Sequence, residues 1–299
     1  MSFWFGKDAT AQGVAKQRLI ETLAPPSKRV ISDPYAKRFV LGASLIKLMG
    51  HRLSVLITEK FAPGFHQHLI ARTRFFDDCI QEAVENGVDQ YVILGAGYDL
   101  RAHRLDLPSS LRVFEVDQAE VQKRKRKKLP QHLFNSENVS YVSVDFNHQS
   151  LVERLLASGF DPNKPTIFTL EGVSQYITKP ALATTIEALA ALTHRTDATF
   201  LMSYVDERLN SDPKACFGDG YPHVVKRVNT IKDLSDKFGE PWVSFYRSDE
   251  IEQMLSGYGF KVAENKTLED LNGRYFEPIG RKVPEQHVMK LEHFVVARA

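Results

Sequence analysis

Two glycines directly after a short apolar segment are the first residues that suggest chemistry. Residues 91–94 are apolar, and Gly95-Ala96-Gly97 follows them. This pattern predicts a buried parallel strand entering a tight turn, where the missing Cβ atoms let the backbone approach a ligand closely. A third glycine would complete the dinucleotide fingerprint at position 100, but Leu100 stands there. The turn therefore favours a nucleoside cofactor without a pyrophosphate.

An acidic residue follows the next apolar segment at a spacing suited to a ribose. Residues 113–117 predict a second short strand, and Asp117 ends it. It stands about 20 residues after Gly95, the spacing at which an acid reaches ribose hydroxyls. A carboxylate accepts hydrogen bonds from both hydroxyls, which suits any adenosine-bearing ligand. Asp117 alone does not distinguish NAD from S-adenosylmethionine.

Polar residues also follow the third and fourth predicted strands, at residues 141–144 and 166–170. The carboxyl ends of parallel strands share one edge of a sheet, and ligands bind at that edge. Asp145 could accept a hydrogen bond from an adenine amino group there, while Phe146 packs on the ring. Glu171 takes the same position after the fourth strand, beside the point where the strand order reverses.

The order of elements predicts an α/β fold, a doubly wound, mostly parallel seven-stranded sheet. Helical spacing of apolar residues predicts helices over 69–85, 180–192 and 248–256. Further strands are expected at 199–204, 259–264 and 293–297, the last two as a hairpin. An N-terminal helical extension precedes the sheet.

The chain is expected to form a single domain over residues 1–299. The expected segments are an N-terminal helical cap (1–88), a cofactor-binding core (89–204), a lid insertion (205–247) and a C-terminal helix with strands (248–299). The lid is inferred because residues 206–246 hold turn residues and more aromatics than a simple connection needs. These aromatics are Phe217, Tyr221, Phe238, Trp242, Phe245 and Tyr246.

Composition gives no sign of a nucleic-acid or membrane partner. The 299 residues carry a formal net charge of +2, and no apolar run reaches the roughly 18 residues of a membrane span. The six cations at 123–128 are expected on a solvated helix face rather than on phosphates. Cys79 and Cys216 offer no metal-ligand spacing. We therefore expect a cytoplasmic protein without a metal, whose oligomeric state the sequence leaves unknown.

Together these ordered motifs resemble the leucine carboxyl methyltransferase-like family of class I S-adenosylmethionine-dependent methyltransferases, in its small-molecule O-methyltransferase branch. The resemblance covers most of the chain. It rests on Asp33-Pro34-Tyr35-Ala36, on residues 71–77, 94–99 and 114–117, on Asp145-Phe146 and on Glu171-Gly172-Val173. The sequence departs from the family at Leu100, where threonine is usual, and at Ser32, where some members carry lysine. Lys28 or Arg29 could replace that lysine.

The resemblance implies a Rossmann-like methyltransferase fold with S-adenosylmethionine as the cofactor. Arg72 would bind the carboxylate of its methionine part, which suits the two-pronged guanidinium. The remaining implied contacts are Gly95, Ala96 and Gly97 against the cofactor, Asp117 at the ribose, Asp145 and Phe146 at the adenine, and Glu171 beside the methionine amino group.

The expected activity is an O-methyltransferase acting on a carboxylate or hydroxyl of a small molecule. A carboxylate acceptor needs no base, whereas a hydroxyl gains from one. No catalytic residue is assigned; candidates on the substrate side are Tyr176, Tyr204, Tyr221 and His223. The alternatives are a protein C-terminal carboxyl methyltransferase and a non-catalytic S-adenosylmethionine-binding protein. An NAD-dependent oxidoreductase is disfavoured by Leu100.

Overall fold

The structure is a computed structural model that describes residues 9–134, 137–144 and 149–299. Within it the chain divides into two units, each of which is described by itself. The sheet unit comprises Asp77–Tyr204, Val243–Asn265 and Phe294–Ala299, and the helical unit comprises Met1–Phe76, Val205–Trp242 and Lys266–His293. The expected single domain with four segments stays a prediction.

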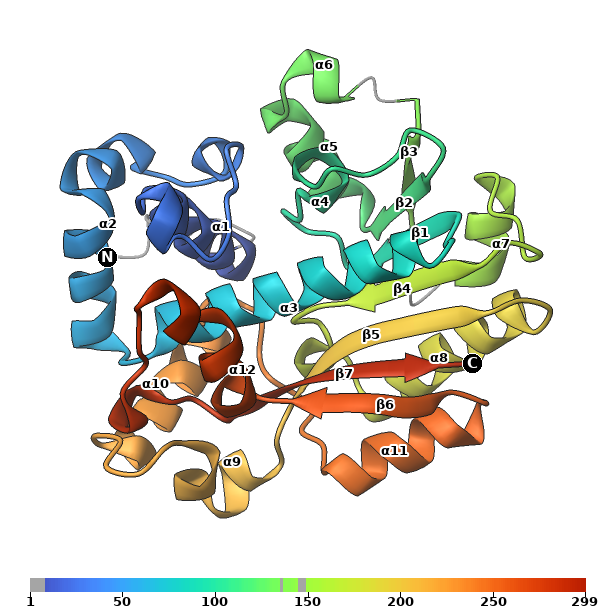
Figure 1. The fold of residues 1–299 in the computed structure, drawn as a ribbon. Helices are drawn as coiled ribbons and strands as arrows, with labels where there is room; N and C mark the ends of the chain where they lie inside the picture. Colours follow the sequence, from blue (N-terminus) through green and yellow to red (C-terminus); the bar gives the residue numbers. More distant parts are fainter. Residues whose placement is uncertain (1–8, 135–136, 145–148) are drawn as a thin grey trace. The chain divides into compact units, whose positions relative to one another are not determined.

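The sheet unit is built on seven strands in the order β3-β2-β1-β4-β5-β7-β6 (Figure 1). The strands are β1 (Gln90–Leu94), β2 (Arg112–Asp117), β3 (Val139–Ser143), β4 (Thr166–Leu170), β5 (Ala198–Val205), β6 (Lys261–Lys266) and β7 (Glu292–Arg298). Neighbouring strands from β3 to β5 pair in parallel. Strand β7 runs opposite to β6 in Figure 1. The predicted doubly wound, mostly parallel sheet is confirmed.

Apolar side chains on both faces explain why β1 and β4 are entirely buried. Alternate residues such as Val92 and Phe168 join one core cluster, and Tyr91 and Ile167 join another. A strand buried on both faces has a continuous apolar sequence, which is the pattern of residues 91–94. One apolar cluster therefore packs against each face of the sheet.

Helices cover the two faces of this sheet. Residues of α7 (Leu151–Ala157), α8 (Lys179–Thr193) and α11 (Ser248–Gly257) belong to the first cluster, and the C-terminal half of α3 (Phe65–Glu85) belongs to the second. The unit also contains α4 (Arg101–Arg104), α5 (Ala119–Lys128) and α6 (Gln131–Phe134). Strand order jumps from β1 to β4, so the point of reversal lies between them.

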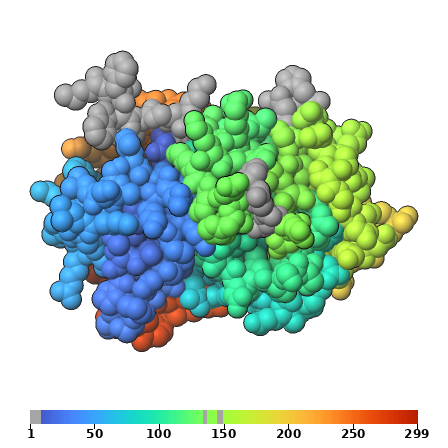
Figure 2. All heavy atoms as spheres, turned by 90° about the horizontal axis from the view of Figure 1, so that it is seen from above, coloured from blue at the N-terminus to red at the C-terminus, as the bar shows by residue number. Residues whose placement is uncertain are grey.

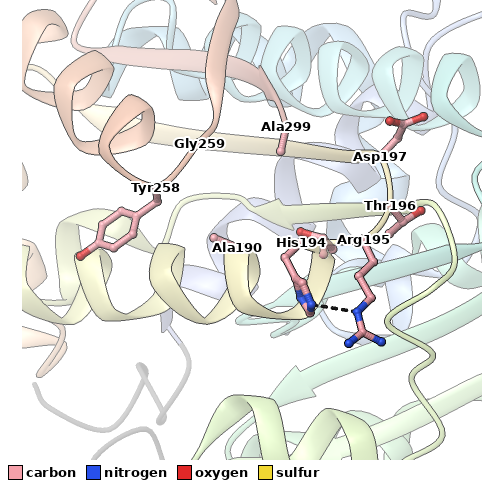
Figure 3. A pocket seen from close by; sticks show the side chains of 9 residues that line it. Ala190, His194, Arg195, Thr196, Asp197, Tyr258, Gly259 and Ala299 are labelled. Carbon is pink, nitrogen blue, oxygen red and sulfur yellow. Dashed lines mark hydrogen bonds between the residues drawn. The ribbon is translucent and has the colours of Figure 1, made fainter.

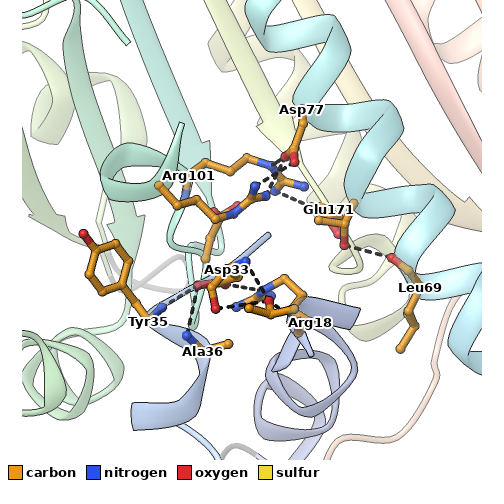
Figure 4. Close-up of polar contacts among 12 residues, drawn as sticks. Arg18, Asp33, Tyr35, Ala36, Leu69, Asp77, Arg101 and Glu171 are labelled. Atoms are coloured by element: carbon orange, nitrogen blue, oxygen red, sulfur yellow. Dashed lines mark hydrogen bonds and ion pairs between the residues drawn. The ribbon is translucent and has the colours of Figure 1, made fainter. Parts of the chain in front are cut away.

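The helical unit contains α1 (Ala9–Thr22), α2 (Ala43–Phe61), the start of α3, α9 (Arg208–Ser211), α10 (Val224–Lys237) and α12 (Leu268–Tyr275). Figure 2 shows the residues of α1 and α2 in blue at the surface. The motif at Asp33 fixes a turn: its carboxylate accepts hydrogen bonds from Arg18 and from the backbone of Tyr35 and Ala36 (Figure 4). No helix in the described ranges is long and apolar enough to cross a membrane.

One cation of α5 departs from the expected solvated face. Lys125 is buried, and its Nζ lies 2.6 Å from Oε2 of Glu115 on β2. Burial raises the pKa of Glu115, although Lys125 acts in the opposite direction. A buried carboxylate is costly without a cation, so one member of the cation run turns inward.

Removing this cation tests the buried pair. Lys125→Met leaves the Glu115 carboxylate buried without its partner, and should lower the free energy of unfolding by about 3–5 kcal/mol. Lys127→Met, on the exposed side of the same helix, should change it by less than about 0.5 kcal/mol. Urea unfolding of both variants measures the difference. Equal losses in the two variants would show that the pair contributes nothing specific.

Candidate functional site

The carboxyl ends of β1, β2 and β4 place three predicted site residues at one edge of the sheet. Leu94 pairs in register with Val116, and Ile93 pairs with Thr169. Gly95, Asp117 and Glu171 therefore follow or end neighbouring strands on the same side. Ligands of open α/β sheets bind at this edge, next to the reversal of strand order.

The turn after β1 needs glycine for two physical reasons. Gly95 has φ +67°, and a Cβ there would lie 2.6 Å from Cγ2 of Val173. Gly97 also has a positive φ, of 42°. Ala96 is buried, and its N–H donates to the carbonyl of Val116, which fastens the turn to β2. The turn therefore brings backbone close to the tip of β4.

Asp117 is oriented by the turns around it. The Gly97 N–H donates to Oδ2 and the Gln118 N–H donates to Oδ1, each at 2.6 Å. A carboxylate has about four acceptor positions, so it can accept ligand hydroxyls in addition to these N–H groups. Its place at the end of β2 suits a ribose.

Arg101, which the sequence analysis missed, lies at the centre of this edge. It is buried, and its guanidinium donates to Asp77 (2.6 Å), Asp99 (2.5 Å) and Glu171 (2.5 Å), as Figure 4 shows for Asp77 and Glu171. Arg104 donates two further hydrogen bonds to Asp77. The sequence places Arg101 just after the glycine turn, which was the one signal that it could belong to the site. The sequence does not show that its side chain is buried.

Electrostatics keep this cluster ionised. Burial alone would raise the pKa of Asp99, but the attraction of Arg101 and further cations holds it well below 3.8. Burial opposes the charge on Arg101 too, yet Asp99 and Glu171 raise its pKa well above the ordinary value. Burial also raises the pKa of Tyr91, so its hydroxyl stays neutral. Asp99 and Arg101 therefore stay charged near neutral pH.

The charges at this edge fit S-adenosylmethionine. Arg101 and Arg104 contact Asp77, Asp99 and Glu171, and Asp117 lies at the end of β2 on the same edge. The edge therefore holds four carboxylates and two guanidinium groups. An excess of two negative charges suits a ligand that bears a sulfonium and an ammonium group. The oriented carboxylate of Asp117 adds acceptors for its ribose. These acceptors and negative charges therefore match the cofactor that the motifs imply.

Not every residue expected at the cofactor is described at this edge. Arg72 belongs to the helical unit, where it is buried and its Nη1 lies 2.9 Å from both carboxylate oxygens of Glu292. This guanidinium is thus already held by a protein carboxylate, and its role at the cofactor stays a prediction. Asp145 and Phe146 lie outside the described residues.

The four substrate-side candidates fall in different units. Tyr176 and Tyr204 belong to the sheet unit, where Tyr204 is buried and its hydroxyl accepts a hydrogen bond from Asn265. Tyr221 and His223 belong to the helical unit. The Tyr221 hydroxyl donates to the carbonyl of Pro63, and burial raises its pKa to about 12. His223 has a left-handed backbone at the start of α10. Their roles stay predictions.

A separate pocket of about 530 Å³ lies at the opposite end of the sheet, before β5 and β6 begin (Figure 3). Its lining includes His194, Arg195, Tyr258 and Ala299. His194 and Arg195 are exposed and bond to each other at 3.0 Å. Parallel sheets bind ligands at the carboxyl end, so this pocket is not part of the site.

Comparisons with known proteins show the family to which the chain belongs. The sequence profile of the leucine carboxyl methyltransferase family matches residues 11–190. A Rhodococcus jostii (strain RHA1) protein, named provisionally as an S-adenosyl-L-methionine-dependent methyltransferase, is 32% identical over 284 residues, which cover 92% of this chain and 88% of that protein. A Mycobacteroides abscessus protein with the same designation is 37% identical over 186 residues, covering 61% of this chain and 59% of its own.

Solved structures support the fold. A DUF574 family protein from Streptomyces avermitilis is 13% identical, with a TM-score of 0.57 over 95% of this chain and 96% of its own. The fold and the cofactor edge together define an S-adenosylmethionine-dependent methyltransferase. Within that class, the chain belongs to the leucine carboxyl methyltransferase family.

Binding measurements on Asp117 test the cofactor edge. Asp117→Asn removes the charge that would strengthen two ribose hydrogen bonds, so S-adenosylmethionine affinity should fall about 10- to 100-fold. Asp106→Asn, on an exposed loop of the same unit, should leave the affinity unchanged. Calorimetric titration with S-adenosylmethionine, S-adenosylhomocysteine and NAD gives the readout. Tight NAD binding would argue against the assignment.

Acid titration tests Arg101. Arg101→Met leaves buried carboxylates without their cation and should cost about 3–5 kcal/mol of stability at neutral pH. Because the pKa of Asp99 is depressed, this stabilisation is fully present above its ordinary pKa of 3.8 and is lost as the pH falls from there through the lower pKa of the folded state. Urea unfolding between pH 2 and 7 should show the wild-type advantage shrinking below about pH 4. The exposed Arg195→Met should show no such trend.

Proposed function

We propose that the chain transfers the methyl group of S-adenosylmethionine to an oxygen atom of a small molecule, a carboxylate or a hydroxyl. The observation that carries the proposal is the carboxyl edge of the sheet, where Asp117 and Glu171 flank the glycine turn beside an excess of negative charge. The family description, which names a carboxyl group as the acceptor, supports oxygen over nitrogen or carbon.

In this proposal the chain's own residues bind and orient rather than react. When bound, the cofactor supplies a methyl group on a positively charged sulfur. Asp117 fixes the ribose, and Glu171, itself held by Arg101, accepts hydrogen bonds from the amino group. The backbone at Gly95 allows close approach. Alignment of an acceptor oxygen in a dry site then provides most of the rate enhancement.

The nature of the acceptor decides whether a base takes part. A carboxylate attacks without losing a proton, whereas a phenol or alcohol must lose one. Tyr204 is the candidate that is buried near the carboxyl end of β5, a strand that runs parallel to β4. A small-molecule acceptor is favoured over a protein terminus because the family motifs of this chain resemble the small-molecule branch.

Transfer of a radioactive methyl group tests the acceptor. The chain is incubated with methyl-labelled S-adenosylmethionine and panels of small carboxylic acids, phenols and peptides with a free C-terminal carboxylate. We expect label on a small acid or phenol, with alkali releasing methanol from an ester but not from an ether. Asp117→Asn should raise the cofactor KM at least tenfold, and Asp106→Asn should not. Label on peptides alone would contradict the proposal.

A further inference from the structure

Three side chains of metal-ligand type meet inside the helical unit. Glu21 lies on α1, His51 on α2 and His66 near the start of α3. One ligand atom of each lies within 4.8 Å of the others. The side chains of Glu21 and His66 are fully buried, and that of His51 is 16% exposed. None of these residues belongs to the cofactor edge described above.

Two distances among these atoms are close to those between ligands of one metal ion. Oε2 of Glu21 lies 3.0 Å from Nε2 of His66 and 3.5 Å from Nε2 of His51. Two ligands that bind a tetrahedral zinc ion at about 2.0–2.1 Å lie roughly 3.3 Å apart. The His51 nitrogen is buried and has no hydrogen-bond partner among the described residues.

Both ring nitrogens of His66 face buried side chains. Its Nδ1 lies 2.9 Å from Oε1 of Gln17, and its Nε2 lies 3.0 Å from Oε2 of Glu21. Nε2 of His66 and Nε2 of His51 therefore lie beside the same carboxylate oxygen. An imidazole ring that donates from one nitrogen can bind a metal ion with the other.

The surroundings hold these ligands in place. Oε1 of Glu21 accepts hydrogen bonds from the Val30 N–H at 2.7 Å and from Arg281 at 2.6 Å, which leaves Oε2 facing the histidines. Metal ligands in proteins are typically oriented by a hydrogen bond to their other polar atom. Oε1 of Glu21 and Nδ1 of His66 both have such a partner. Gly50, with φ 70° and ψ −179°, interrupts α2 directly before His51. That backbone conformation is open mainly to glycine.

We propose that Glu21, His51 and His66 bind a divalent transition-metal ion of the zinc type, with water in the fourth position. Imidazole and carboxylate ligands suit this ion, and three protein ligands leave one position open. The ion ties α1, α2 and α3 together across the interior of the helical unit. This structural role departs from the expectation of no metal, which rested on the two cysteines.

Metal titration of the full chain tests the proposal. After chelator dialysis, Zn²⁺ is titrated by calorimetry, and Co²⁺ is followed by its visible absorption. We expect one ion per chain, a Co²⁺ spectrum of low coordination number and a higher Tm with Zn²⁺. His51→Gln should lower the Zn²⁺ affinity at least tenfold. The partly exposed position of His51 makes this variant compatible with folding.

The matched control is His287→Gln, because His287 forms a similar contact, at 2.8 Å, with Glu59 in the same unit. It should bind Zn²⁺ like the wild type. The proposal is overturned if the wild type binds no Zn²⁺ at micromolar concentration. It is also overturned if His51→Gln binds as tightly as the wild type, or if both variants lose the ion alike.

Discussion

The cofactor edge depends on one buried cation. Arg101 joins Asp77 at the start of the sheet-unit part of α3, Asp99 in the glycine turn and Glu171 at the tip of β4. Without it, three carboxylates from separate parts of the chain would repel one another in a site of low dielectric constant. With it, the turn and the strand tip are held in register, and the edge still keeps a negative excess for a cationic ligand.

The two units use buried charge in related ways. In the sheet unit, guanidinium groups and Lys125 neutralise buried carboxylates. In the helical unit, Arg72 bonds to Glu292, and Arg281 bonds to Glu21. Buried pairs of this kind add little net stability, but their loss is severe. They determine which segments of the chain pack together. An apolar side chain can pack against many others, whereas a buried carboxylate needs a cation or a hydrogen-bond donor.

Local signals in the sequence predicted the elements well. The fourth strand was placed at residues 166–170, as observed, and the helix expected at 69–85 begins only a few residues earlier. Both depend on short-range apolar periodicity. The turn at Gly95 and the acid at Asp117 could also be found, because the geometry of a parallel sheet fixes where they lie. The family resemblance, now confirmed, rested on the same motifs.

Features that depend on burial could not be found in this way. Lys125 stands in a run of six cations, and only the packed helix shows which one faces Glu115. Glu21, His51 and His66 have no regular spacing, so nothing local connects them.

Contacts between distant parts of the chain have a further consequence, for folding during synthesis on the ribosome. The helical unit joins Arg72 to Glu292 across 220 positions and Glu21 to Arg281 across 260, so its first helices must wait for nearly the whole chain to emerge before they gain their partners.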